Sequence, residues 1–257
     1  MPSDLPRARV IVLDIGTHMG QEARLISDRS VPFALRILLD LFKHYRGRPQ
    51  LFREFREIRR LQARLAQFEF FFCFVEPILY QPMLASLKHF GNFVLLKGVC
   101  SSAKSGPEVL RLARASLGHS IIESKPNLSG NTVPTWNFNF ESLLRWVDAN
   151  ARRNAHDRLI LRMNAEGVEK DIIATMAALD SDAPRVNAMF GSLGDIKKCF
   201  GEEALRTAER QLASMKVSHV YFTSSPKSWR AALMSLEQLL TAATDSPGDA
   251  AHAVRAR

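Results

Sequence analysis

The sequence predicts an α/β fold with a doubly wound, mostly parallel sheet. Short apolar runs without alternation, such as Val10 to Leu13, recur along the chain and are separated by segments of helical periodicity. Such runs are typical of strands buried on both faces of a parallel sheet. Polar or glycine residues follow the first two runs directly, namely Asp14 and Gly16 after one and Glu76 after the other. Because ligands of open α/β sheets bind outside the carboxyl ends of strands, we expect a binding site there.

The expected elements alternate between strand and helix along most of the chain. They are a strand at 10–13, a helix at 21–29, a helical hairpin at 28–68, a strand at 70–75, a helix at 79–89, a strand at 92–99, an irregular segment at 101–131, a half-exposed strand at 133–140, a helix at 141–152, a strand from 159, a helix at 169–179, a strand at 186–190, a helix at 195–215, a strand at 217–223 and a helix at 227–242.

Length and composition predict a single domain at 1–242 and a disordered tail at 243–257. The chain has 257 residues, 46% of them hydrophobic, which is enough for one sizeable core. No apolar run reaches about 18 residues, so we expect no transmembrane helix. Only nine residues precede the first strand, which leaves no room for a signal peptide. Cys73, Cys100 and Cys199 lack metal-binding spacing, so we expect buried thiols in a reducing, cytoplasmic compartment and no metal.

The hairpin at 28–68 is strongly basic. Between residues 36 and 64 the chain has nine basic and three acidic residues. This excess favours an anionic partner, such as nucleic acid, a membrane surface or a phosphorylated acceptor. The alternative is a solvated face in which Glu57 pairs with Arg53 and Arg60. We interpret the hairpin as an insertion, because removing its 41 residues restores ordinary spacing between Asp14 and Glu76, which lie 62 positions apart.

Glu76 closes the second strand at the place where a nucleoside site needs a carboxylate. A carboxylate can accept hydrogen bonds from both hydroxyls of a ribose. The glycines at positions 16 and 20 allow the preceding loop to turn sharply and to approach a ligand closely.

Three stretches together resemble motifs of the FkbM family of S-adenosylmethionine-dependent methyltransferases. LDIGTHMGQE is similar to the family's D-x-G-A-N-x-G loop, FVEP to its F-E-P, and LRMNAEGVEKDII to its l-K-i-D-v-E-G-x-E segment. The likeness covers residues 8 to 195 without the hairpin. It implies a Rossmann-like class I methyltransferase fold and S-adenosylmethionine as cofactor. The cofactor-binding residues that it implies are the loop residues Asp14, Gly16, Thr17 and Gly20 and the ribose-binding Glu76, while the segment 164–167 would face the methyl group and the acceptor.

The sequence departs from the family pattern where the chemistry should occur. Asn164 stands where the family has Asp, and an amide does not take up a proton at neutral pH. A hydroxyl acceptor needs a general base within hydrogen-bond reach. The candidates are Glu166, His18 and Glu169, and we expect Glu166 first because it follows a strand end. The alternative is that Glu166 only holds its loop and that His18 is an ordinary polar loop residue.

The leading functional hypothesis is O-methylation of a hydroxyl on a saccharide, a lipid-linked saccharide or a natural product. An RNA methyltransferase is the second enzyme class, suggested only by the basic hairpin, which we expect to lack interleaved exposed aromatic residues for stacking on bases. A non-catalytic derivative of the fold is allowed by Asn164. A nicotinamide oxidoreductase is disfavoured, because the spacing from Gly16 to Gly20 does not give the G-x-G-x-x-G pattern.

Overall fold

A six-stranded parallel sheet forms the centre of the computed structural model, which describes residues 9–242 except 47, 80, 115–117 and 181–182. Its strands are β1 (Arg9–Ile15), β2 (Glu69–Val75), β3 (Phe93–Leu96), β7 (Arg158–Met163), β8 (Ala188–Gly191) and β9 (Ser218–Tyr221). They lie in the order β3-β2-β1-β7-β8-β9, and every described pairing is parallel. The direction of strand succession reverses between β1 and β7, as in Rossmann-like doubly wound folds. The predicted α/β fold class is confirmed.

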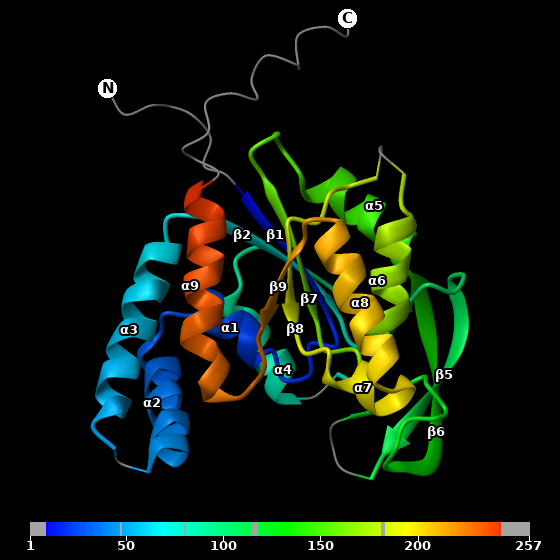
Figure 1. Ribbon diagram of the computed structural model, residues 1–257. Helices are drawn as coiled ribbons and strands as arrows, with labels where there is room; N and C mark the ends of the chain where they lie inside the picture. Colours follow the sequence, from blue (N-terminus) through cyan, green and yellow to red (C-terminus); the bar gives the residue numbers. More distant parts are fainter. Residues whose placement is uncertain (1–8, 47, 80, 115–117, 181–182, 243–257) are drawn as a thin grey trace, which may run out of the picture.

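Helices cover both faces of this sheet (Figure 1). One face is covered by α1 (Gln21–Ser27), α2 (Val31–Tyr45), α3 (Gln50–Leu65), α4 (Gln81–Ser86) and α9 (Pro226–Ala242), and the other by α5 (Phe140–Ala151), α6 (Glu169–Ala178), α7 (Gly194–Phe200) and α8 (Glu202–Ser214). Val10 and Val12 of β1 belong to the first hydrophobic cluster, and Ile11 and Leu13 to the second. Successive side chains of a strand point to opposite faces of the sheet, so the unbroken apolar run of β1 contributes side chains to both hydrophobic clusters.

The hairpin formed by α2 and α3 contributes to the core of the first face. The hydroxyl of Ser30 accepts a hydrogen bond from the Phe33 N–H and so caps α2, whose first turn contains Pro32. The helix α3 packs against α9 and α1. Ile37 and Ile58 are fully buried in the same cluster as residues of α1 and α9. The hairpin is therefore integrated with the sheet domain.

A second, three-stranded sheet lies beside the main one, in the order β4-β6-β5 (Figure 1). Its strands are β4 (Val99–Ser101), β5 (Gly106–Ala113) and β6 (Leu128–Asn139). The prediction of an irregular segment at 101–131 is therefore wrong for β5 and for the start of β6, whereas the described residues between these two strands are mostly irregular, as predicted. Antiparallel pairing of β5 with β6, from Gly106↔Asn137 to Ala113↔Leu128, satisfies the backbone there. The polar composition hid this strand because much of its surface is exposed, and β-structure depends on such distant partners more than on propensity.

Two further expectations differ from the structure in detail. The helix predicted at 195–215 is divided into α7 and α8 by Gly201, whose φ of 85° and ψ of 178° interrupt the helix. The strand predicted at 92–99 ends at Leu96. The tail at 243–257, predicted to be disordered, lies outside the described residues. Among the helices that the structure describes, none is both long and apolar enough to cross a membrane.

Candidate functional site

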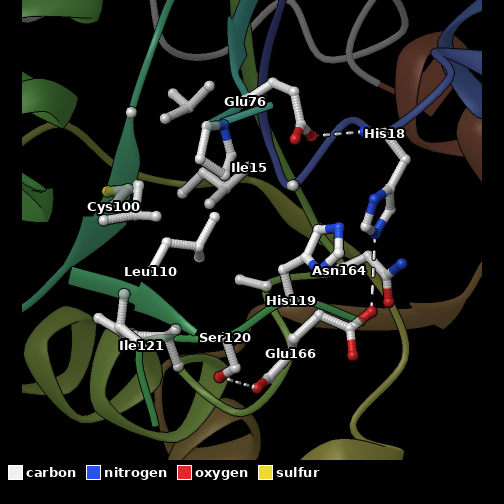
Figure 2. Close-up of a pocket in the computed structure, with 17 residues that line it drawn as sticks. Ile15, His18, Glu76, Cys100, Leu110, His119, Ser120, Ile121, Asn164 and Glu166 are labelled. Atoms are coloured by element: carbon white, nitrogen blue, oxygen red, sulfur yellow. Dashed lines mark hydrogen bonds and ion pairs between the residues drawn. The ribbon is translucent and has the colours of Figure 1, made fainter. Parts of the chain in front are cut away.

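A pocket opens at the carboxyl ends of β1, β2 and β7 (Figure 2). The space inside it, counted to its open mouth, is about 460 Å³. Ile15, Val75 and Cys100 form part of an apolar wall, and Leu110 of β5 and Ile121 from the loop after it also line the pocket. The pocket lies where the strand order reverses, which is where ligands bind in folds of this kind.

Glu76 follows β2 directly and presents a buried carboxylate at this pocket. Its Oε2 accepts a hydrogen bond from the His18 backbone N–H at 2.7 Å, and its Oε1 accepts one from the Ile78 N–H at 3.1 Å. Burial raises the pKa of Glu76, although the neighbouring His18 acts to lower it. Each carboxylate oxygen can accept a second hydrogen bond, so Glu76 keeps acceptor capacity for hydroxyl groups of a ligand.

Two loops meet closely at one side of the pocket. The Gly16 N–H donates to the carbonyl oxygen of Val75 at 2.9 Å, and the Asn164 N–H donates to that of Ile15 at 3.0 Å. Backbone pairing thus continues past the strand ends. Gly16 has a φ of 73°, and a Cβ at this position would lie 2.2 Å from the Asn164 carbonyl oxygen. Only glycine fits this conformation and this approach.

Glu169, the first residue of α6, holds the loop that precedes it. Its carboxylate accepts hydrogen bonds from the Ala165 N–H at 2.7 Å and the Gly167 N–H at 2.6 Å. The side chain is fully buried, and burial raises the pKa of Glu169 to about 7 despite these hydrogen bonds. Between the two amides, Glu166 has a positive φ of 60°. Glu169 does not line the pocket, so it positions Glu166 and is not placed to act as a base itself.

The side chains of His18, Lys125 and Ser120 all contact Glu166. Its Oε1 lies 3.6 Å from Nε2 of His18, and its Oε2 forms an ion pair with Nζ of Lys125. The hydroxyl of Ser120 donates to the Glu166 carbonyl oxygen at 2.8 Å. Figure 2 shows His18 between Glu76 above and Glu166 below. Among the described residues, neither ring nitrogen of His18 has a hydrogen-bond partner, although both nitrogens are buried.

This arrangement changes the expected role of Glu166. Burial alone would raise its pKa, but the nearby imidazole of His18 and the hydrogen-bonded ammonium group of Lys125 outweigh burial and lower the pKa of Glu166 to about 2. A carboxylate with so low a pKa is a weak proton acceptor at neutral pH. The unsatisfied imidazole of His18 is the better candidate to receive a proton, with the Glu166 carboxylate stabilising the resulting positive charge.

A buried ion cluster supports the loop after β1. Arg162 of β7 lies opposite Asp14 of β1 in the sheet, and its Nη1 donates to the Asp14 Oδ1 at 2.8 Å and to the Gly16 carbonyl oxygen at 2.7 Å. Its Nη2 lies 2.9 Å from Oε1 of Glu22 in α1. Burial alone would lower the pKa of the Arg162 guanidinium, but the two carboxylates outweigh it and raise that pKa. Asp14 therefore supports the loop after β1 through Arg162, which bonds both to Asp14 and to the Gly16 carbonyl oxygen.

Most of the residues singled out in the sequence converge on the pocket. Those that line it are Gly16, His18, Glu76, Asn164 and Glu166. Asp14, Thr17 and Gly20 are not among its lining residues. The Thr17 hydroxyl donates to the Asp14 carbonyl oxygen at 3.1 Å, and Gly20, with a φ of 67°, precedes α1.

Sequence reasoning missed the contribution of residues 119–125 to this site. Ser120 and Lys125 bond to Glu166, and His119 also lines the pocket. The Nδ1 atom of His119 accepts a hydrogen bond from the Ala113 N–H at 2.9 Å. These residues belong to the segment expected to be irregular. Nothing in their spacing points to Glu166, because only the fold of the second sheet brings them there.

Two of the three thiols are buried as expected from the sequence, whereas Cys199 in α7 is only partly buried. Cys73 and Cys100 are buried, and burial raises the pKa of Cys73 to about 12, so it is an unreactive thiol at neutral pH. No group of three or more His, Cys, Asp or Glu side chains in the described part of the chain could hold a metal ion.

Comparison of the chain with protein families, curated proteins and solved structures finds no match.

Proposed function

We propose that this pocket binds S-adenosylmethionine and that the protein methylates a hydroxyl group of a saccharide, a lipid-linked saccharide or a natural product. The observation that supports this most directly is the convergence of Glu76, His18 and Glu166 on one pocket at the sheet's switch point. The resemblance of these strand ends to FkbM motifs is the reason that we propose S-adenosylmethionine as the cofactor. We extend the proposal to a cytoplasmic location, since Cys73 and Cys100 are free thiols.

The residues present fit the nucleoside part of the cofactor. Glu76 has a buried carboxylate with remaining acceptor capacity, as two ribose hydroxyls require. Val99 and Cys100 supply apolar surface suited to a purine ring. Asn164 and Glu166 lie across the pocket opening at the end of β7, where the acceptor would meet the methyl group. When bound, S-adenosylmethionine supplies a methyl group on a sulfonium that is already a good leaving group.

The chain's own task is then to orient the acceptor hydroxyl and remove its proton. In our proposal His18 Nδ1 accepts that proton. Its Nε2–H faces Glu166, whose carboxylate remains ionised and stabilises the imidazolium. Lys125 and Ser120 keep Glu166 in place through its side chain and its carbonyl oxygen. Asn164 orients the hydroxyl and leaves proton removal to His18.

Calorimetric titration with S-adenosylmethionine tests the cofactor. Glu76→Gln should weaken binding by about 1.5–3 kcal/mol, the range of a hydrogen bond to a charged group. Glu141→Gln, in the first turn of α5 and outside the pocket, is the matched control and should bind as the unsubstituted protein does. NAD is the competing ligand, because the strand order β3-β2-β1-β7-β8-β9 is shared with dinucleotide-binding folds. Absence of S-adenosylmethionine binding, or tighter binding of NAD, would contradict the proposal.

Turnover measurements with hydroxyl acceptors separate the roles of His18 and Glu166. His18→Gln should lower turnover by roughly 10²–10⁴-fold with cofactor affinity unchanged, the usual loss for a general base. Glu166→Gln should cost less, because it removes only the group that stabilises the imidazolium. A larger loss in Glu166→Gln than in His18→Gln would make Glu166 the base. A sharp rise in Asn164→Asp would instead show a weakened form of the family's site, and cofactor binding without any transfer would favour a non-catalytic protein.

A further inference from the structure

Helix α2 is apolar on two opposite sides. Phe33, Ile37 and Leu41 point into the core of the first face and are buried. Val31, Leu35, Leu39 and Phe42 recur at spacings of four, four and three, which places them together on the other side of the helix. A helix that is apolar on both sides normally has a protein or lipid partner on each of them.

The second side of α2 is largely exposed to solvent. Val31 is 72% exposed, Leu35 and Leu39 are each 56% exposed, and Phe42 is 57% exposed. Phe52, near the start of α3 and across the hairpin turn, is 63% exposed. These five residues form the apolar stripe of the hairpin. Contiguous exposed apolar surface of this kind marks an interaction site more often than single exposed residues do.

Positive charge surrounds the apolar stripe. The acidic side chains of the hairpin are already paired, since Asp40 contacts Arg36, Glu57 contacts Arg60 and Glu54 contacts Arg230 of α9. In the described part of the hairpin, the following exposed basic side chains have no acidic partner: Lys43, Arg46, Arg48, Arg53 and Arg56.

A basic hollow lies at the tip of the hairpin, where the stripe ends. It is lined by His44, Tyr45, Arg46 and Arg48 and by Lys227 in the first turn of α9. Basic side chains around a hollow at the end of an apolar stripe match the two parts of an anionic lipid, whose phosphate lies above its acyl chains.

We propose that the apolar stripe and the basic residues around it dock the protein on the surface of an anionic lipid bilayer. The stripe would enter the boundary between headgroups and acyl chains, and the arginines and lysine would contact lipid phosphates. A second copy of the chain fits less well, because it would bring two positively charged faces together. Nucleic acid also fits less well, because three of the five stripe residues are aliphatic and only Phe42 and Phe52 offer rings on which bases can stack.

This inference does not depend on the proposed methyl transfer. The stripe lies outside the pocket, and no residue of α2 or α3 lines that pocket. Membrane docking is measured without cofactor or acceptor, so its failure leaves the proposed function unaffected, and the reverse also holds.

Flotation with vesicles tests the docking face. The full chain should float with vesicles of phosphatidylcholine and phosphatidylglycerol and remain in solution with phosphatidylcholine alone. Leu35→Ser/Leu39→Ser/Phe42→Ser should lower the bound fraction about tenfold or more, because less apolar surface leaves water on docking. These side chains are exposed, so the folded state should persist, which circular dichroism checks. The matched control Val109→Ser/Trp146→Ser removes exposed apolar side chains elsewhere and should bind normally.

Charge is tested separately. Lys43→Gln/Arg46→Gln/Arg53→Gln should also weaken binding, and so should raising the ionic strength from about 0.1 M to about 1 M, which shortens the Debye length from about 10 Å to about 3 Å. Equal binding to both vesicle types, or none, overturns the proposal. It is also overturned if sedimentation shows a dimer that the Leu35, Leu39 and Phe42 substitutions dissociate, or if the face binds RNA and not vesicles.

Discussion

Glu169 makes the stability of this protein depend on pH in a direction that the structure determines. Burial raises the pKa of its carboxyl group to about 7, even though both oxygens accept backbone hydrogen bonds from Ala165 and Gly167. An unfolded chain exposes the same group, which then titrates near its ordinary value of about 4.3. The folded state therefore binds a proton that the unfolded state releases.

The magnitude follows from this difference in pKa. Below about pH 4 the carboxyl is protonated in both states and contributes no pH dependence. Between about pH 4.5 and pH 7 the folded state keeps the proton while the unfolded state loses it, so the free energy of unfolding falls as pH rises. Above about pH 7 both states have lost the proton, and the loss of free energy of unfolding due to Glu169 no longer changes with pH. A separation of roughly 2.7 pKa units at about 1.4 kcal/mol each gives a total loss of about 3.7 kcal/mol, of which about 3 kcal/mol falls between about pH 4.5 and pH 8.

Urea unfolding of the protein and of Glu169→Gln, from about pH 4.5 to about pH 8, measures this loss. The glutamine cannot accept both amide hydrogen bonds, which shifts its stability by a constant of about 1–3 kcal/mol. Subtracting the two stabilities cancels all other titrations, and the difference should fall by about 3 kcal/mol across the range. Glu209→Gln on the exposed surface of α8 is the control and should show no such fall. A flat difference for Glu169→Gln would refute the reasoning.

Two further substitutions test the support of the pocket. Arg162→Met leaves two buried carboxylates without their cation and should lower the free energy of unfolding by about 3–5 kcal/mol, measured in urea; Arg145→Met on the surface should change it little. Gly16→Ala forces a Cβ against the Asn164 carbonyl oxygen at a positive φ and should destabilise the protein by more than about 1 kcal/mol and abolish ligand binding. Gly106→Ala, where a Cβ meets nothing within 4 Å, is its control, and equal thermal stability of the two glycine variants would contradict this account.

Local sequence patterns predict the sheet and one side of the candidate site. The apolar runs of β1, β2 and β7 can be buried only in the middle of a parallel sheet, and parallel strands end at the same edge. Gly16, Glu76, Asn164 and Glu166 follow those strands directly, so their meeting at one pocket follows from local pattern. The hairpin formed by α2 and α3 was likewise predictable from the sequence, because its apolar residues recur with a helical period.

Whether Glu166 or Glu169 can take up a proton near neutral pH depends on contacts that exist only in the folded chain. Lys125 reaches Glu166 across 41 positions of sequence, because the second sheet folds back over the pocket. That contact and His18 lower the pKa of Glu166, and complete burial raises that of Glu169. A carboxylate's pKa depends on its burial and its nearest charges, which come from distant parts of the chain. The sequence spacing of Glu166 and Glu169 therefore could not tell the two apart, and the fold assigned one to an ion pair and the other to the support of a loop.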